Sequence, residues 1–187
     1  MFERFTTLDE IFCYKLGTAL TMEHDSLDLM EELSKSAMRS VLTEFFDEHA
    51  QETRLNIENL EQCLALMGKE NSQHPSPTTK GLAKELKSFM AKTDNTLVDA
   101  VVVAGALESQ HHEVAVYESL LLQAKSLDVT EAVPLLSQNY SREQLALEKL
   151  RAAADTLAQA DARDQDGANG AGHAVIEVPP YLPPGSV

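Results

Sequence analysis

Apolar residues recur every three or four positions along most of the chain, a spacing that is typical of amphipathic helices. Thr7 and Glu10 form a capping box at the first helix start, and Gly68 is suited to end the second helix. The pattern predicts long helices over about 8–35, 40–68, 96–127 and 130–160, with a short helix over 80–92. No strand alternation is present before residue 161.

Four long helices and one short one predict an all-α four-helix bundle that consists of two helical hairpins with the extra helix between them. We assign residues 1–160 to this bundle and residues 161–187 to a flexible linker and an extended, Pro-rich apolar tail. A terminus of this kind is either disordered or packed, and its apolar residues leave the bundle and a neighbouring subunit open as packing partners.

The chain of 187 residues has 30 acidic and 15 basic residues, a formal charge of −15. That balance argues against binding to nucleic acids or anionic membranes, both of which require basic patches. No apolar run approaches the roughly 20 residues of a membrane helix, and the first residues lack the pattern of a signal peptide. Cys13 and Cys63 are expected to be buried, reduced thiols, so the expected location is the cytoplasm.

One glutamate interrupts the apolar stripe of each long helix: Glu23, Glu52, Glu113 and Glu143. Glu52 follows Glu23 by 29 residues, and Glu143 follows Glu113 by 30. An offset of 90 residues aligns the two halves and places Glu23 on Glu113, which indicates a duplicated hairpin. Two such hairpins packed face to face would bring the four carboxylates to one depth inside the bundle.

Four buried carboxylates need compensation by cations, protons or basic partners. Fe and Mn accept oxygen ligands readily, and helical bundles hold two such ions with Glu and Glu-x-x-His ligands. Here Leu55 and Ala146 occupy the His positions, so the available substitutes are His49, Asn56 and Gln110. The alternative is that each glutamate pairs with a basic side chain, for which Arg54, Arg142 and Lys15 are the candidates.

Several segments, in order, resemble the YciE/YciF family of ferritin-like bacterial proteins over roughly residues 8–157. They are Glu52-Thr53, the segment 57–68 (IENLEQCLALMG), Lys80-Gly81-Leu82, the segment 110–117 (QHHEVAVY), Ala124-Lys125 and Glu143. The resemblance implies a ferritin-like bundle, a homodimer, a di-metal carboxylate site and a link to bacterial stress. Its inward carboxylates fall on Glu23, Glu52, Glu113 and Glu143, with Asn56 and Gln110 as weak neutral ligands. The chain departs from the family pattern at Asn56, Gln110 and Leu147, where the family commonly has His or Gln, Glu and an acidic residue respectively.

Two functions follow as hypotheses. In the first, two Fe or Mn ions give ferroxidase- or catalase-like chemistry beside Tyr117 and Tyr140. In the second, the protein is a largely non-catalytic, stress-associated scaffold with a degenerate site that binds metal weakly or not at all. The replaced ligands favour the second hypothesis, in which no residue is catalytic.

Overall fold

The structure, a computed structural model, describes residues 4–70 and 72–169, the side chains of 161–169 excepted. Its helices are α1 (Leu8–Ser36), α2 (Ser40–Leu66), α3 (Pro77–Met90), α4 (Val98–Ser126) and α5 (Ala132–Asn169), with a 3₁₀ turn η1 (Asn95–Leu97) before α4. No strand occurs in this part of the chain, so the all-α prediction is confirmed. Within the described helices, none has both the length and the apolar content needed to cross a membrane.

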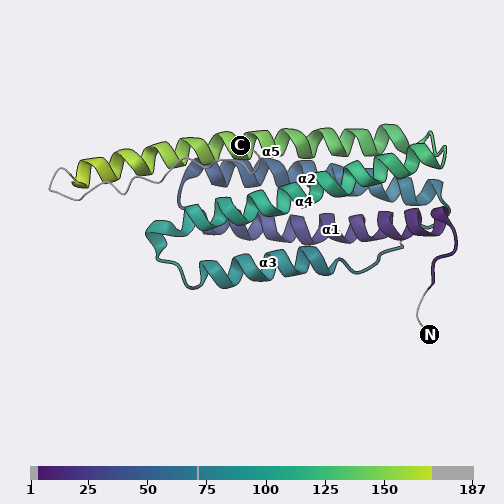
Figure 1. Cartoon of the computed structure of the whole chain (residues 1–187), viewed down its shortest axis with the longest axis horizontal. Helices are drawn as coiled ribbons and strands as arrows, with labels where there is room; N and C mark the ends of the chain where they lie inside the picture. The colour runs from purple at the N-terminus through teal and green to yellow at the C-terminus, as the bar shows by residue number, and fades with distance from the viewer. Residues whose placement is uncertain (1–3, 71, 170–187) are drawn as a thin grey trace, which may run out of the picture.

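The four long helices form an antiparallel bundle, and α3 lies along its outside (Figure 1). Helix α1 packs against α2 and α4, α5 packs against α4 and α2, and α3 covers α4 and α1. The hairpins are therefore α1–α2 and α4–α5, as the sequence repeat predicts. The offset of 90 residues holds at both ends of the first helices, from Leu8 to Val98 and from Ser36 to Ser126.

Helix α5 is longer than the sequence pattern indicates. It continues to Asn169, nine positions beyond the predicted end, and extends past the rest of the bundle (Figure 1). The segment 161–169 was assigned to the linker because of its Asp and Gly residues, but its Ala, Arg and Gln residues favour a helix that is already nucleated. The predicted tail from Gly170 onward lies outside the described residues.

At the ends of α2 and α4 the chain turns through a residue with a left-handed backbone conformation. Gly68 has φ +64°, and the N–H groups of Gly68 and Lys69 donate to the carbonyls of Ala65 and Leu64, each at 2.9 Å. This Schellman pattern confirms the predicted role of Gly68. Asp128 has φ 56° at the end of α4 and turns the chain toward α5 in the same way.

The segment between α2 and α3 crosses directly over α1. A Cβ on Gly17 would lie 2.6 Å from the backbone oxygen of Ser72. The His74 N–H donates to the Gly17 carbonyl at 3.2 Å, and the His74 ring stacks on Tyr14 with a centroid separation of 4.3 Å. Only a residue without a side chain allows this contact.

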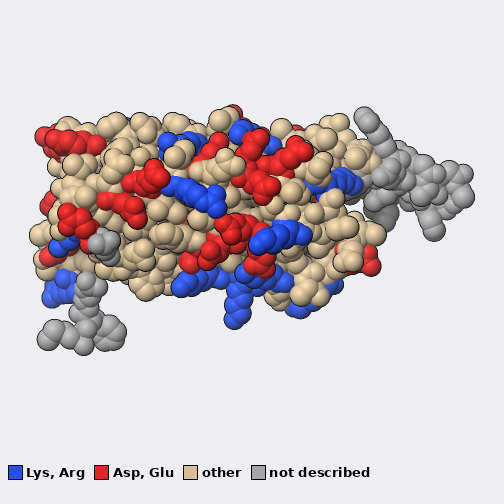
Figure 2. All heavy atoms as spheres, turned by 180° about the vertical axis from the view of Figure 1, so that it is seen from behind, with Lys and Arg blue, Asp and Glu red and all other residues tan. Residues whose placement is uncertain are grey.

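Helix α3 is held by apolar contacts centred on Leu86 and by a row of charges. Leu86 fills the space beside Gly105 on α4, where an added Cβ would lie 2.6 Å from the nearest leucine carbon. Lys87 pairs with Glu32 of α1, and Lys80 and Lys84 face the same helix. Figure 2 shows basic side chains along the edge of the bundle where α3 lies, with acidic side chains beside them.

The core has two apolar clusters, one toward each end of the bundle. One cluster includes Leu33, Phe46, Val102 and Leu150. The other includes Phe12, Leu64, Leu120 and Leu136. Between them lies a layer of buried polar residues, and this layer holds the candidate site.

Candidate metal centre

The polar layer receives one or more buried side chains from each long helix. Its acidic and imidazole members are Glu23 from α1, His49 from α2, Glu113 from α4 and Glu143 from α5. Each of these side chains is at least 98% buried. The layer therefore concentrates three carboxylates and one imidazole away from bulk solvent.

His49, Glu113 and Glu143 form a compact group that we call the inner cluster. One ligand atom from each lies within 4.8 Å of the others. His49 Nε2 is 3.6 Å from Glu143 Oε2 and 3.9 Å from Glu113 Oε2. An imidazole nitrogen and two carboxylate oxygens are a donor set that Fe and Mn accept.

Two buried amides act on Glu143. Asn56 Nδ2 donates to Glu143 Oε1, and Gln110 Nε2 donates to Glu143 Oε2. The Asn56 oxygen is occupied because it accepts from Arg142 Nη1 at 3.0 Å. Both predicted neutral ligands thus lie beside the inner cluster, but each presents an N–H group to Glu143 rather than an oxygen to a cation.

Glu23 belongs to a separate hydrogen-bond network in the same layer. Tyr117 Oη donates to Glu23 Oε1 at 2.5 Å, and Asn139 Nδ2 donates to Tyr117 Oη at 3.0 Å. The other Glu23 oxygen has no partner among the described residues. Tyr117 was predicted to lie beside the carboxylates, and this contact places it there as a hydrogen-bond donor in the core. The spacing of apolar residues gives no signal for Asn139.

Glu52 does not point inward as predicted. Its side chain is 25% exposed, with Oε2 3.6 Å from His49 Nδ1 and Oε1 3.6 Å from Lys149 Nζ. The inward position on α2 is taken by the fully buried Thr53, one residue further along. One residue turns a helix by about 100°, which is enough to move a side chain from the core to the edge.

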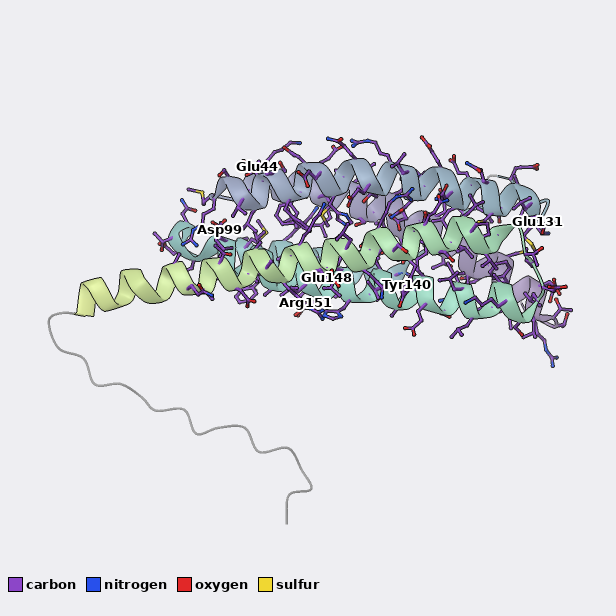
Figure 3. All side chains as sticks on the ribbon, turned by 90° about the horizontal axis from the view of Figure 1, so that it is seen from above. Glu44, Asp99, Glu131, Tyr140, Glu148 and Arg151 are labelled. Atoms are coloured by element: carbon purple, nitrogen blue, oxygen red, sulfur yellow. The ribbon has the colours of Figure 1, made fainter. Side chains whose placement is uncertain are left out.

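Two of the basic residues that could have paired with the four glutamates contact other groups instead. Arg54 pairs with Glu31 on the surface at 2.9 Å, and Arg142 donates to the amide oxygens of Asn56 and Asn139. Tyr140, the second candidate redox tyrosine, is half-buried against an apolar core cluster on α5, and its hydroxyl accepts from Gln144 (Figure 3). Tyr117 is therefore the tyrosine that reaches the polar layer.

Burial raises the pKa of Glu143 to about 8, with the positive charge of His49 opposing this shift. Burial and the charges of Glu143 and Glu113 raise the pKa of Glu23 well above its usual range. Burial alone would lower the pKa of His49, but the neighbouring carboxylates raise it well above the ordinary value. The raised pKa values mean that, without a metal ion, some carboxylates of the polar layer are protonated and therefore uncharged.

The donor atoms of the inner cluster fit a metal ion. Glu113 Oε2 and both ring nitrogens of His49 are buried without a hydrogen-bond partner among the described residues. Leaving a buried polar atom unpaired is costly, so such atoms call for a water or an ion. The residues present therefore fit one small cation, although the structure does not identify which.

The bundle and its buried Glu and His side chains define a ferritin-like helical protein with a site able to hold a metal ion. Residues 7–163 match the family described as Domain of unknown function (DUF892), and the chain belongs to that family. This agrees with the predicted YciE/YciF resemblance, because Protein YciF of Escherichia coli is 24% identical over 140 residues, 74% of this chain and 84% of its own length.

Solved structures show the same fold. YcfI of Rhodopseudomonas palustris is 27% identical with a TM-score of 0.78, covering 81% of this chain and 98% of its own. The Escherichia coli stress protein YciF is 23% identical with a TM-score of 0.75, covering 80% of this chain and 96% of its own. A protein of Xanthomonas campestris pv. campestris is 19% identical with a TM-score of 0.69, covering 86% and 99%. The ferritin-like fold is therefore shared across these proteins.

Proposed function

We propose that this protein is a stress-associated, ferritin-like scaffold that binds one divalent transition-metal ion in its inner cluster and has no catalytic turnover of its own. The observation that carries the proposal is the set of unpaired buried atoms on His49 and Glu113, which face Glu143 from two other helices. A bound ion would take the place of the protons that this layer otherwise holds and would supply the positive charge that its carboxylates need.

The amides support one ion rather than two. A dinuclear centre in a helical bundle uses four carboxylates and two histidines. In this chain Asn56 and Gln110 donate their N–H groups to Glu143, and Glu52 lies at the edge of the bundle. Glu23 is bound by the Tyr117 hydroxyl and lies outside the inner cluster. The inner cluster itself has one imidazole and two carboxylates, which are enough to hold a single Fe or Mn ion.

A non-catalytic role follows from the same contacts. The carboxylate of Glu143 already accepts two amide N–H groups, which leaves it little freedom to shift during a reaction. The link to stress is supported by the Escherichia coli relative, which is a stress protein. Redox chemistry is the second candidate, supported by the Tyr117 hydroxyl at 2.5 Å from Glu23.

The proposal includes a homodimer, as the family resemblance implies. Helix α2 exposes Val41, Leu55 and Leu66, whose separations of 14 and 11 residues place them on one stripe of the helix. An apolar stripe on the surface supports a partner interface. Light scattering of the purified full chain measures this directly, and a mass of one chain would contradict it.

The test of metal binding is titration of the metal-free protein with Co(II), Mn(II) and Fe(II), with the bound metal counted by elemental analysis. We expect one ion per chain in the wild type and none retained by His49→Ala. His111→Ala is the matched control, because His111 is exposed and contacts Arg151 on the surface. No bound ion in the wild type would contradict the proposal.

Addition of Fe(II) and oxygen separates the two candidate functions. The scaffold predicts that iron oxidation in the presence of protein is no faster than with His49→Ala. Rapid oxidation that is lost in both His49→Ala and Tyr117→Phe would instead favour the redox function.

A further inference from the structure

An unbroken line of charged groups connects the inner cluster with the surface between α2 and α5. It starts inside at Glu143, passes His49, and reaches Glu52, with both steps at 3.6 Å. Lys149 of α5 then lies 3.6 Å from Glu52 and 3.4 Å from Glu48. The exposed fraction rises along this line, from 25% for Glu52 to 39% for Lys149 and 67% for Glu48.

His49 is the link between the two ends. Its side chain is 99% buried, and its Nδ1 atom points toward Glu52 without a hydrogen-bond partner among the described residues. Its Nε2 atom faces Glu113 and Glu143. One imidazole thus has one nitrogen toward the inner cluster and the other toward the carboxylate that reaches solvent.

A surface hollow of about 370 Å³ opens beside this line. Its walls are Glu44, Phe45 and Glu48 of α2 and Lys149, Ala152 and Ala153 of α5. The Phe45 ring stacks on His49 with a centroid separation of 5.8 Å, so the hollow is separated from the imidazole by one aromatic ring. Figure 3 looks onto α2 and α5 from above and labels Glu44 on the first of these helices.

We infer that this hollow is the route by which a divalent cation reaches the inner cluster, and that Lys149 controls the rate of passage. The inference rests on the proposed metal binding. The ammonium group of Lys149 lies between the carboxylates of Glu48 and Glu52. An incoming cation would first exchange water for carboxylate oxygen at this place. A cation on this route therefore competes with Lys149 for the same two side chains.

The positive charge of Lys149 repels an approaching metal ion, whereas the carboxylates of Glu44 and Glu48 attract the ion. A residue on a route changes association and dissociation together, because the ion passes it in both directions. A residue that supports the bound ion changes the affinity instead. The two rates measured separately therefore distinguish a controlling role from a ligand-supporting one.

The experiment follows Co(II) uptake by the metal-free full chain through its visible absorption in a stopped-flow instrument, and Co(II) release into a chelator. We expect Lys149→Met to accelerate both uptake and release about threefold to tenfold, with the absorption spectrum of the bound ion unchanged. The acceleration is expected to shrink as salt is added, because the charge is at the surface. Glu48→Gln is expected to slow uptake.

Two variants serve as controls. Lys149→Arg keeps the charge and is expected to retain the slow wild-type rate. Lys87→Met removes a lysine of similar exposure that pairs with Glu32 on the α1–α3 side, and it is expected to leave both rates unchanged.

Equal rates in wild type and Lys149→Met would overturn the route while leaving metal binding intact. A changed spectrum or a change in affinity without faster release would also overturn it, because Lys149 would then support the bound ion. Absence of Co(II) uptake by the wild type would instead overturn the proposed function itself.

Discussion

The first helices of the two hairpins, α1 and α4, are both 29 residues long and carry their glutamates at equivalent positions. Glu23 precedes the last residue of α1 by 13 positions, and Glu113 does the same in α4. Both side chains are buried. The repeat is therefore faithful in the helices that open each hairpin.

The second helices differ. Glu143 of α5 is completely buried, whereas Glu52 of α2 lies at the edge beside Lys149. The inward position of α2 at this depth belongs to Thr53, and Glu52 comes one position before it. That one position turns Glu52 out of the core by about 100°, and His49 supplies the inward donor. A shift of one position thus exchanges an oxygen ligand for a nitrogen ligand.

The largest expected effect comes from neutralising the two unequal glutamates in turn. Glu143→Gln removes a donor of the inner cluster, so Co(II) affinity is expected to fall by more than about 100-fold, equivalent to ~2.7 kcal/mol. Glu52→Gln removes a carboxylate that reaches the inner cluster only through the outer nitrogen of His49 and otherwise pairs with Lys149, and a decrease of less than about tenfold is expected. Calorimetric or spectroscopic titration of both variants measures the difference.

Equal losses in the two variants would break this comparison. They would mean that Glu52 turns inward to ligate the ion when metal is present. Circular dichroism of the metal-free variants provides the control for folding.

A second change converts the chain toward a dinuclear centre. Gln110→Glu replaces an amide that donates to Glu143 by a carboxyl group at a buried position. Without metal, the lost hydrogen bond and the added repulsion are expected to cost about 1–3 kcal/mol in the free energy of unfolding. With excess Mn(II), the added ligand is expected to raise the bound metal from one ion per chain to two.

Gln144→Glu is the matched control for this change, because Gln144 lies on the exposed side of α5 beside Tyr140. It is expected to alter neither the metal count nor the stability. A Gln110→Glu protein that still holds one ion would show that this position does not decide the number of ions.

The sequence predicts the bundle, the repeat and the burial of Glu23, Glu113 and Glu143 because apolar spacing fixes which face of a long helix is inside. It does not fix the register on α2. Glu52 and Thr53 both fit the spacing between His49 and Asn56, and an unbroken alternation of steps of four and three, 42–46–49–53–56–60, favours Thr53. The internal repeat favours Glu52 instead, because Glu143 is the glutamate at the equivalent depth of the second hairpin.

The polar contacts are harder to predict than the burial. Tyr117 reaches Glu23 across 94 residues of sequence, and Asn139 reaches the backbone carbonyl of Asn56 across 83. Such pairs depend on the relative height of two helices, which spacing within one helix does not contain. The extended end of α5 was missed for another reason, since Asp and Gly outweighed the helical neighbours on either side of them.

The pH dependence of stability tests the same contrast between the two glutamates. The pKa of Glu143 rises from 4.5 to about 8 on folding, so the folded state binds an additional proton between these values. The contribution of Glu143 to the stability of the metal-free protein is therefore fully present below about pH 4.5 and is lost as pH rises through 8. The raised pKa values of Glu23 and His49 act in the same direction.

Thermal unfolding of the metal-free protein between pH 5 and pH 8 measures this loss, expected to be on the order of 1–3 kcal/mol. Glu143→Gln is expected to flatten the profile. Glu52→Gln is expected to change the profile much less. The pKa of Glu52 itself is lowered by His49, so its own effect falls below pH 4.5, and its removal acts in this range only through the pKa of His49. Metal affinity is expected to rise with pH, since the ion displaces the bound protons. A stability that rises from pH 5 to pH 8 would contradict the raised pKa of Glu143 in the folded protein.

The smallest expected effect concerns a second asymmetry. The segment after α2 crosses α1, and no described residue crosses α4 in the same way. Position 17 is Gly where the repeat has Leu107, because the backbone of Ser72 lies against it. Gly17→Ala gains helix propensity but forces this backbone to move, so a net loss of about 1–2 kcal/mol is expected. Gly81→Ala in α3 meets nothing within 4 Å and is expected to stabilise by about 0.5–1 kcal/mol. Denaturant unfolding gives the free energy of unfolding of both variants. Equal stabilisation would mean that the backbone at Ser72 moves away from residue 17 without loss of stability.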